Sequence, residues 1–529
     1  MVQRLPAWVA VRPFPVTVLA GALSAFGFAP WGLWPVTILS LALLLALLDR
    51  APSGKAAFAL GYGYALGQFT VGLNWIAFAF TFQDAMPHWF GYGAVLLLSV
   101  YLAVYPAVAT LLAWRLSQSG RTGGGGAMAL TLLLAGGWAL TEYLRATLFT
   151  GFAWNPLGVV WVGTGVDHMA RLIGTYGLAT VAVMAGGAVW MFLRGQRKLA
   201  LAFVAKLVVV VLLGWLHSHW TRPDASARAV AIRVIQPNIP QDEKYDPRSE
   251  VRNFRKLAGL SGAPSPTPRL LFWPEAAVAA LLDMEPDWRE RLAALLGPGD
   301  LLMTGGDKYY FRPTKDAFYH PNDLVGANNS LWVVTPRAGI AGRYDKAHLV
   351  PYGEYLPMRS LLSAIGLSRL VPGDVDFWPG PGPRTLMLPA GRTGGRERPA
   401  LHMGVQICYE IIFSGQVVDR ADRPDFLFNP SNDAWFGSWG PPQHLAQARL
   451  RAVEEAMPVI RSTPTGISAI IDAGGDVTGR IAPHRAAALD GLLPPPAPPT
   501  LFARFGNILS ILLALSLVVS GVALARLRR

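Results

Sequence analysis

Long apolar segments fill both ends of the chain and leave a more polar segment between them. A helix needs about 20 apolar residues to cross a bilayer. Eight segments approach that length, at residues 14–28, 34–48, 56–80, 89–114, 127–149, 166–193, 199–220 and 506–525. The pattern predicts eight spans, with the first two forming a tight hairpin around Pro30 and Pro35. A cleaved signal peptide is the alternative for the first segment, but no small-residue cleavage site stands out.

The polar segment 221–505 alternates short apolar runs with helical stretches. We predict strands at 230–236, 270–273, 301–304, 331–335, 403–407, 426–429 and 467–471, and helices at 247–257, 287–296 and 442–456. This alternation predicts an extramembrane α/β domain whose sheet is covered by helices. The stretch 379–399, rich in Pro, Gly and Arg, is typical of a surface loop. Residues 492–505, which begin with a Pro-rich run, are expected to link this domain to the last span.

Composition and charge agree with this division. Only 15% of the 529 residues are charged, against about 25% in soluble domains, which excludes a purely soluble enzyme. A net charge of +13 raises the question of nucleic acid. However, the apolar ends, 1–220 and 506–529, carry +11 of that charge, and 221–505 shows no basic stripe with interleaved aromatic residues. We therefore expect no nucleic-acid partner.

The positions of the basic residues predict the orientation in the membrane. Lys and Arg near span ends are retained on the cytoplasmic side. If the N-terminus is cytoplasmic, twelve basic residues flank the inner ends of the spans, and the short outer loops 29–33, 81–88 and 150–165 carry none. Both termini are therefore expected in the cytoplasm. The polar segment then lies outside, which is the periplasm in a Gram-negative cell.

A few ionisable residues remain within the predicted spans, namely Glu142, Arg145, His168 and Arg171. A charge in lipid is costly, so such residues usually face a partner or a cavity. Glu142 and Arg145 lie one helical turn apart and are expected to pair structurally. Alternatively, Arg145 helps to hold a lipid phosphate at the outer leaflet.

Cys408 is the only cysteine and follows the apolar run 403–407. A strand end followed by a helix presents a side chain at the edge of a sheet, which suits a nucleophile. In an oxidising compartment this thiol has no intramolecular disulfide partner. A buried structural cysteine is the alternative.

A thiol needs a base or a neighbouring cation to react at neutral pH. None of the nine histidines has a papain-like or caspase-like context, so a carboxylate is the better candidate base. Glu275 directly follows an apolar strand, where partial desolvation is expected to raise its pKa. Lys346 lies among aromatic, Pro and Gly residues and would supply a fixed cation for a developing oxyanion. A solvated glutamate and an ordinary surface lysine are the alternatives.

These contexts resemble the nitrilase, or carbon–nitrogen hydrolase, superfamily. The resemblance covers most of 229–480 and rests on VIQPNI at 234–239, WPE at 273–275, NS at 329–330, the lysine segment 343–357, ICYE at 407–410, NDAWFG at 432–437 and RSTPTGI at 461–467. With spans before and after it, the whole chain resembles the apolipoprotein N-acyltransferase family. The resemblance implies a nitrilase-like α-β-β-α sandwich over 221–491, between seven helices in 1–220 and an eighth in 506–529.

By the same resemblance, Glu275 is the general base, Cys408 the nucleophile and Lys346 the stabiliser of the tetrahedral intermediate. The implied supporting residues are Glu354, Tyr409 and Glu410. The implied substrate-binding residues are Tyr245, Asn329, Trp435 and Phe436. Tyr245 stands where some members carry tryptophan, so any role specific to indole is in doubt.

Two further features concern the lipid. Trp435 and Phe436 either contact lipid or belong to the core. The run 352–370 is apolar enough to form an arm that dips into the outer leaflet, and a core helix with its loop is the alternative.

The implied reaction transfers an acyl chain from a phospholipid, with phosphatidylethanolamine as the expected donor, to the N-terminal amine of a diacylglyceryl-modified apolipoprotein. A Cys408 thioester is the implied intermediate, the chain is expected to act as a monomer in the bacterial inner membrane, and no metal or other cofactor is implied. A membrane-tethered amidase is the second hypothesis, although a hydrolase of soluble amides has little use for eight spans. A transporter with a large outer domain is the third. No HxxxxD motif of a different acyltransferase class appears in or beside the spans.

Overall fold

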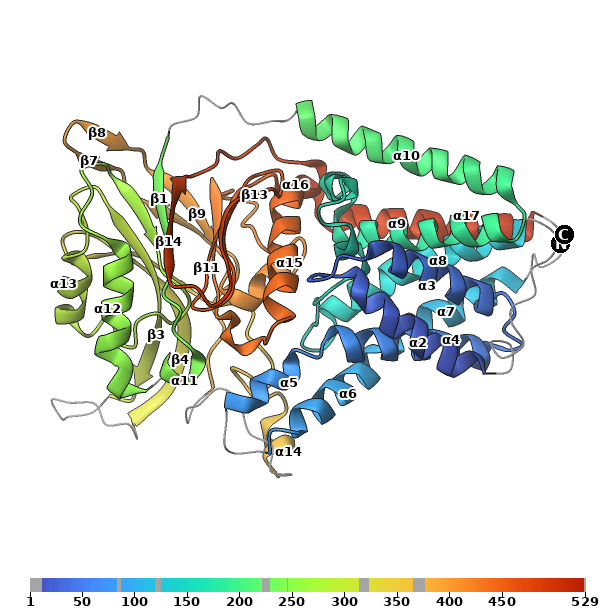
Figure 1. Ribbon diagram of the computed structural model, residues 1–529, viewed down its shortest axis with the longest axis horizontal. Coiled ribbons are helices and arrows are strands. Elements are labelled where there is room, and N and C mark those ends of the chain that lie inside the picture. The colour runs from blue at the N-terminus through green and yellow to red at the C-terminus, as the bar shows by residue number, and fades with distance from the viewer. Residues whose placement is uncertain are drawn as a thin grey trace.

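The computed structural model describes residues 12–82, 87–118, 125–220, 229–244, 246–313, 323–364 and 376–527. It has two parts, a domain of long helices and an α/β domain (Figure 1).

The helical domain is built from apolar helices that coincide with the predicted segments. They are α2 (Pro13–Ser24), α3 (Trp34–Leu48), α4 (Gly54–Gly72), α5 (Ile76–Ala79), α6 (Phe90–Leu102), α7 (Val104–Ser117), α8 (Gly125–Thr147), α9 (Ala170–Leu193), α10 (Arg197–Trp220) and α17 (Ile508–Arg526). Among the described residues, five helical stretches are long and apolar enough to cross a membrane. Helix α5 continues into η2 (Phe80–Phe82). If α4 and this segment form one span, bent by 47°, the count rises to six. The first two predicted spans are shorter helices, so the count of eight is not confirmed by length.

Small residues let these helices pack closely. At Gly67 of α4 a Cβ atom would lie 2.0 Å from the carbonyl oxygen of Val18 in α2. At Gly136 of α8 it would lie 2.4 Å from the oxygen of Ala514 in α17. The C-terminal helix therefore packs into the bundle formed by the N-terminal segments. By contrast, only 11% of the apolar window of α10 is buried, so most of this helix presents apolar side chains outward.

The α/β domain contains two six-stranded sheets. The strand order of the first is β14 (Ala487–Leu492), β1 (Ala231–Gln236), β2 (Arg269–Phe272), β3 (Leu301–Phe311), β4 (Leu324–Val334) and β5 (Ile340–Asp345). The strand order of the second is β13 (Val477–Ile481), β12 (Ser468–Ile471), β11 (Val459–Ser462), β10 (Phe426–Pro430), β9 (Leu401–Val405) and β6 (Thr385–Leu388). Strands β1, β2 and β3 are parallel, as are β9, β10 and β11. The carboxyl ends of these parallel strands carry the polar residues described below.

Four layers result, because helices cover the outer face of each sheet. Helices α12 (Glu250–Ser261) and α13 (Pro286–Ala293) cover the first sheet, and α15 (Gly440–Glu455) covers the second (Figure 1). Phe272 and Met303 meet Phe426 and Phe428 in the core between the sheets. The nitrilase-like α-β-β-α arrangement predicted from sequence is therefore present.

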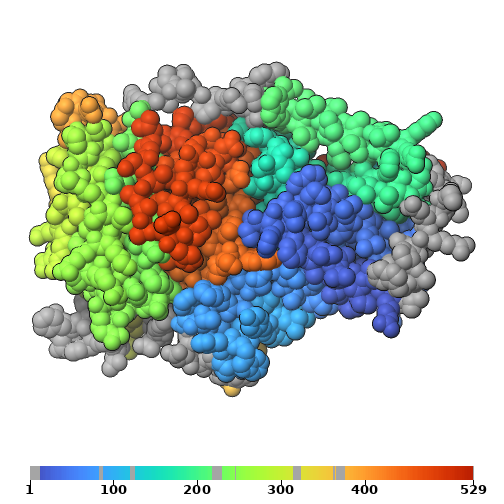
Figure 2. Space-filling view, in the orientation of Figure 1, coloured from blue at the N-terminus to red at the C-terminus, as the bar shows by residue number. Residues whose placement is uncertain are grey.

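The second sheet lies between the first sheet and the helical domain (Figures 1 and 2). One apolar cluster continues from its outer face through α15 into the helices. It includes Leu427 and Val459 of the sheet, Ala448 of α15, and Phe69 and Trp154 of the helical domain. The two domains therefore share a core, and α15 is the layer that joins them.

Some sequence predictions for this domain are wrong. The predicted loop 379–399 contains β6 and the hairpin β7 (Gly391–Thr393) with β8 (Arg396–Arg398). The predicted linker ends in a helix, α16 (Leu501–Phe505), which Thr500 caps by accepting a hydrogen bond from the Ala503 N–H. In both places the Pro, Gly and Arg residues are typical of loops, and the short strands and helix form because contacts with the rest of the fold stabilise them.

Candidate active site

Three predicted residues meet in one buried cluster. Glu275 lies in the loop after β2, Lys346 directly follows β5, and Glu354 lies in the loop beyond it. The Lys346 Nζ is 2.9 Å from Glu354 Oε1 and 3.4 Å from Glu275 Oε1. The amide of Asn329, on β4, donates to Glu275 Oε1 at 2.7 Å and to Glu354 Oε1 at 2.9 Å. One ammonium and one amide therefore hold two carboxylates in fixed positions.

The protonation states of this cluster follow from burial and charge. Burial raises the pKa of Glu275, but Lys346 and Lys244 outweigh it, so the net pKa is lowered. The sequence-based expectation of a raised pKa is therefore wrong: Glu275 is desolvated, but two cations lie beside it. Burial lowers the pKa of Lys346, and Glu354 and Glu275 reverse this and hold it above its ordinary value. At neutral pH the cluster contains a carboxylate base and an ammonium.

Cys408 faces this cluster from the other sheet. It follows β9 and begins the short helix η8 (Cys408–Ile412), as the sequence predicted for a residue after a strand. Only 5% of the residue is exposed. Burial and the negative charge of Glu275 raise the pKa of the thiol well above its usual value, against the opposing effect of Lys346. Cys408 is therefore protonated at neutral pH and needs a base in order to react.

Glu275 is placed to be that base. After Lys346, Lys244 and the Asn329 amide, a hydrogen bond with the Cys408 thiol also lowers the pKa of Glu275. The Oε2 atom of Glu275 is buried and has no hydrogen-bond partner among the described residues. This carboxylate oxygen is open to accept a proton, while Oε1 is held by Asn329 and Lys346.

Glu410 ties the cysteine segment to the lysine segment. Its Oε2 accepts from the Ile407 N–H at 2.7 Å. Its Oε1 accepts from the Tyr344 hydroxyl at 2.9 Å and from the backbone N–H groups of Ala347 at 2.7 Å and His348 at 3.1 Å. One buried carboxylate thus fixes the distance between the two sheets beside the thiol.

Two charged residues near the cluster were not found from the sequence. The Lys244 Nζ donates to the backbone oxygen of Glu275 at 2.8 Å, and burial lowers the pKa of Lys244 to about 8, with Glu275 and Asp307 opposing the shift. Burial raises the pKa of Asp307, on β3, to about 7. Lys244 stands in a polar run and Asp307 in the middle of a strand, so neither position resembles a site in the sequence.

Tyr409, Trp435 and Phe436 lie where the two domains meet. The Tyr409 hydroxyl donates to the oxygen of Gly151 at 3.3 Å. The Phe436 ring lies 4.7 Å from that of Trp75 and 5.4 Å from that of Trp154. The Trp435 ring lies 5.5 Å from that of Phe82. Phe436 therefore belongs to a packed core between the domains, and Trp435 contacts an aromatic residue of the helical domain.

The predicted lipid-facing arm, 352–370, is described only as far as residue 364, because 365–375 lie outside the described residues. Tyr245, predicted to bind substrate, also lies outside them. Within 352–364 a short helix forms, α14 (Arg359–Ala364). Tyr352, Met358 and Leu361 are exposed by 47%, 66% and 59%. These apolar side chains are not part of a core, which favours the arm over the core helix.

Of the ionisable residues of the predicted spans, Glu142, Arg145 and Arg171 are buried and His168 is partly exposed, but Glu142 and Arg145 do not pair directly. Glu142 Oε1 accepts from the Trp138 indole at 3.0 Å and the Leu157 N–H at 2.8 Å. Arg145 donates to the oxygen of Trp154 at 3.0 Å. Arg145 is only 2% exposed, so the structure does not present it to a lipid phosphate.

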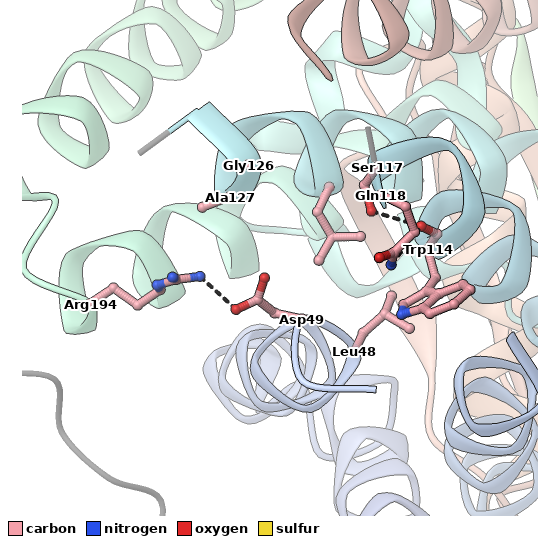
Figure 3. Close-up of a pocket in the computed structure, with 9 residues that line it drawn as sticks. Leu48, Asp49, Trp114, Ser117, Gln118, Gly126, Ala127 and Arg194 are labelled. Carbon is pink, nitrogen blue, oxygen red and sulfur yellow. Dashed lines mark hydrogen bonds and ion pairs between the residues drawn. The ribbon is translucent and has the colours of Figure 1, made fainter. Parts of the chain in front are cut away.

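Two cavities differ in their relation to this cluster. One of about 170 Å³ adjoins Glu275 and Lys244 and is otherwise lined mainly by apolar residues such as Phe254 and Trp288. The other lies at the far end of the helical domain, where Arg194 pairs with Asp49 at 2.7 Å (Figure 3). Only the first adjoins the candidate active site.

Comparison with known proteins agrees with both parts of the fold. Residues 20–188 match the family described as apolipoprotein N-acyltransferase N-terminal domain, and residues 267–487 match carbon-nitrogen hydrolase. A protein named apolipoprotein N-acyltransferase from Bradyrhizobium diazoefficiens is 34% identical, with 96% of this chain and 94% of that protein covered. The chain belongs to the apolipoprotein N-acyltransferase family.

Another protein of this name and one solved structure are also similar. The protein of the same name from Caulobacter vibrioides is 33% identical, with 99% of this chain and 97% of that protein covered. The crystal structure of a carbon-nitrogen hydrolase from Helicobacter pylori covers 50% of this chain and 89% of its own, with 13% identity and a TM-score of 0.33. Membership of the N-acyltransferase family, together with several apolar helices of spanning length, indicates a membrane protein.

Proposed function

We propose that this protein transfers an acyl chain from a membrane phospholipid to the N-terminal amine of a diacylglyceryl-modified apolipoprotein, through a thioester on Cys408. The observation that carries the proposal is the buried cluster of Glu275, Lys346 and Glu354 against the only thiol of the chain. That thiol lies in a domain that shares a core with apolar helices. The family membership agrees with both observations.

The first half-reaction acylates the enzyme. Glu275 takes the proton of the Cys408 thiol, and the thiolate attacks the ester carbonyl of the phospholipid. Lys346, whose ammonium lies 3.4 Å from Glu275 Oε1, stabilises the oxyanion that forms. When the tetrahedral intermediate collapses, the C–O bond breaks, the proton on Glu275 passes to the leaving alkoxide, and a lysophospholipid departs. The acyl chain remains as a thioester.

The second half-reaction transfers the acyl chain. The neutral α-amine of the acceptor attacks the thioester carbonyl, a C–N bond forms, and the C–S bond breaks. Glu275 accepts the proton that the amine loses and returns it to the Cys408 sulfur, so the enzyme is regenerated. Burial of the thiol excludes water, which favours the amine over hydrolysis.

The surroundings of the site suit substrates that are both anchored in lipid. The exposed apolar side chains of Tyr352, Met358 and Leu361 lie beyond Lys346 on the segment that also carries Glu354. We propose that this segment enters the outer leaflet, with the α/β domain in the periplasm and both termini in the cytoplasm. The basic residues at the inner span ends support this orientation.

The test is a complete transfer reaction. The purified full-length chain is incubated in mixed micelles with acyl-labelled phosphatidylethanolamine and a synthetic peptide whose N-terminal cysteine carries a diacylglyceryl group. We expect labelled N-acyl peptide and unlabelled lysophospholipid, and no product with Cys408→Ala. A peptide with an acetylated amine is the matched control and should accept nothing. Release of labelled fatty acid without N-acyl peptide would instead indicate a hydrolase and contradict the proposal.

A further inference from the structure

The backbone of Cys408 is held in an unfavourable conformation. Its φ is +51°, in the left-handed region that residues with a Cβ rarely adopt. Such a conformation persists only when the surroundings impose it. The Cys408 carbonyl oxygen accepts two hydrogen bonds, one from His444 Nε2 at 3.0 Å and a longer one from Asn429 Nδ2 at 3.4 Å. His444 is therefore the closer of the two groups that hold this peptide.

His444 itself is held by an ion pair. It comes from α15 and is fully buried, as is Arg461 of β11, and Asp433 is 2% exposed. Arg461 Nη2 lies 2.6 Å from Asp433 Oδ1 and 3.0 Å from His444 Nδ1. Asp433 Oδ1 also lies 3.1 Å from His444 Nδ1. The three side chains form one closed network behind the nucleophile.

The partners of the ring decide which nitrogen carries the proton. A carbonyl oxygen can only accept, so the nitrogen that faces Cys408 must donate. In a neutral ring Nδ1 then carries no proton and accepts from Arg461, which can only donate. Asp433 can only accept, so in this tautomer its Oδ1 pairs with Arg461 and makes no hydrogen bond to the ring. Burial and the charge of Arg461 lower the pKa of His444, in agreement with a neutral ring. The opposite tautomer would place the lone pair of Nε2 against the lone pairs of the Cys408 oxygen.

We infer that His444 is a positioning residue for the acyl-transfer reaction: Arg461 fixes its Nε2–H tautomer, and this N–H holds the peptide that joins Cys408 to Tyr409. This inference rests on the proposed role of Cys408 as the nucleophile. Because the peptide is planar and trans, its C=O and N–H point in opposite directions. A hydrogen bond that fixes the Cys408 oxygen therefore also fixes the direction of the Tyr409 N–H, beside the attacking sulfur.

The same helix makes this position depend on the helical domain. Gln443, next to His444, accepts from the Trp154 indole at 2.8 Å and donates to the oxygen of Gly72 at 3.2 Å. The Trp154 ring lies 5.3 Å from the His444 ring. Docking of α15 on the helices and placement of the nucleophile therefore involve adjacent residues of one helix turn.

The experiment uses two amide substitutions that imitate different ring nitrogens. The Gln side chain in His444→Gln places an N–H donor where Nε2 lies, whereas the Asn side chain in His444→Asn places one where Nδ1 lies and does not reach Cys408. The readout is the single-turnover rate of thioester formation on the full-length chain with labelled phosphatidylethanolamine. We expect His444→Asn to slow this step on the order of 10²-fold with an unchanged KM for the phospholipid, as for other misplaced reacting groups. We expect His444→Gln to remain within about tenfold of the original rate.

Gln447 supplies a control on the same helix. It is 1% exposed, and neither polar atom of its side chain has a hydrogen-bond partner among the described residues. Gln447→Leu tests whether replacing any buried polar side chain of α15 slows thioester formation. We expect Gln447→Leu to leave the rate of thioester formation unchanged. Equal losses in His444→Asn and His444→Gln, or an undiminished rate in His444→Asn, would overturn the inference.

The failure of this inference is distinguishable from failure of the proposed function. If the unsubstituted chain forms no thioester, the proposed function fails. Alkylation of Cys408 by iodoacetamide then decides the positioning role, because the chain has no other cysteine. The role predicts an alkylation rate that changes in His444→Asn and returns in His444→Gln, and an unchanged rate in His444→Asn contradicts it.

Discussion

The Lys346→Met substitution tests the charge arrangement of the site. Lys346 is 1% exposed and lies between the carboxylates of Glu275 and Glu354, at 3.4 and 2.9 Å. Met has a similar length and no charge, so the cavity stays filled. The two glutamates then share the Asn329 amide without the cation that compensates them.

The expected magnitudes separate stability from chemistry. Removing one partner of a buried ion pair costs about 3–5 kcal/mol of folding free energy. Because the total stability of a protein is about 5–15 kcal/mol, the fold should persist, with a Tm lower by roughly 5–10 °C. Loss of the oxyanion cation alone costs on the order of 10²–10³ in rate. In addition, burial raises the pKa of Glu275 with less opposition once Lys346 is gone, so a smaller fraction of Glu275 is the carboxylate that can take the thiol proton. We expect thioester formation to fall at least about 10³-fold.

A double substitution separates the two effects. Lys346→Met with Glu354→Gln removes both charges of the closer pair, so the Tm should recover while thioester formation stays lost. Thermal unfolding of the full-length chain in detergent, followed by tryptophan fluorescence, and the single-turnover acylation rate give the two readouts. Acylation by Lys346→Met within about tenfold of the original rate, or recovery of the rate in the double variant, would refute the reasoning.

Three further predictions concern carboxylates. Glu410→Gln replaces a carboxylate that accepts four hydrogen bonds, so we expect stability to fall by about 1–3 kcal/mol and acylation to slow. Unchanged stability and an unchanged acylation rate would contradict the role of Glu410 in holding the cysteine and lysine segments together. The Glu454 carboxylate accepts hydrogen bonds from Thr175 and Ser414 and pairs with Arg451 at 2.8 Å. Glu454→Gln weakens these interactions and should lower the Tm. The control Glu397→Gln, at an exposed position, should not. Asp307 has a folded pKa of about 7, above its unfolded value, so stability falls as pH rises from the unfolded pKa to about 7. Asp307→Asn should therefore raise the Tm more at pH 8 than at pH 5, and an equal shift at both values would exclude this cause.

The sequence predicted elements and chemistry where local pattern decides them. All eight apolar segments are helical, and the seven predicted strands coincide with β1, β2, β3, β4, β9, β10 and β12. β11 escaped prediction because its four residues include the buried Arg461, whose charge is compensated by Asp433, outside the strand. The hairpin of β7 and β8 escaped because its Gly and Arg residues are typical of loops.

The site divides in the same way. Glu275, Lys346 and Cys408 stand in distinctive local contexts, and the structure brings Glu275 and Lys346 together and places Cys408 beside them. Lys244, Asp307 and His444 carry no such signal, because each acquires its role from a partner far away in the sequence. The pKa of Glu275 was predicted with the wrong sign for the same reason: burial is visible in a sequence pattern, whereas two neighbouring lysines are not.

The most direct test of the central claim is to trap the acyl-enzyme. The purified full-length chain is incubated with acyl-labelled phosphatidylethanolamine alone, and the labelled peptide is mapped by mass spectrometry. We predict one hydroxylamine-sensitive acyl group on Cys408, none on Cys408→Ala, and discharge of the label to diacylglyceryl peptide on its addition. An acyl group on another residue, an equal adduct on Cys408→Ala, or an adduct that the acceptor does not discharge would contradict it.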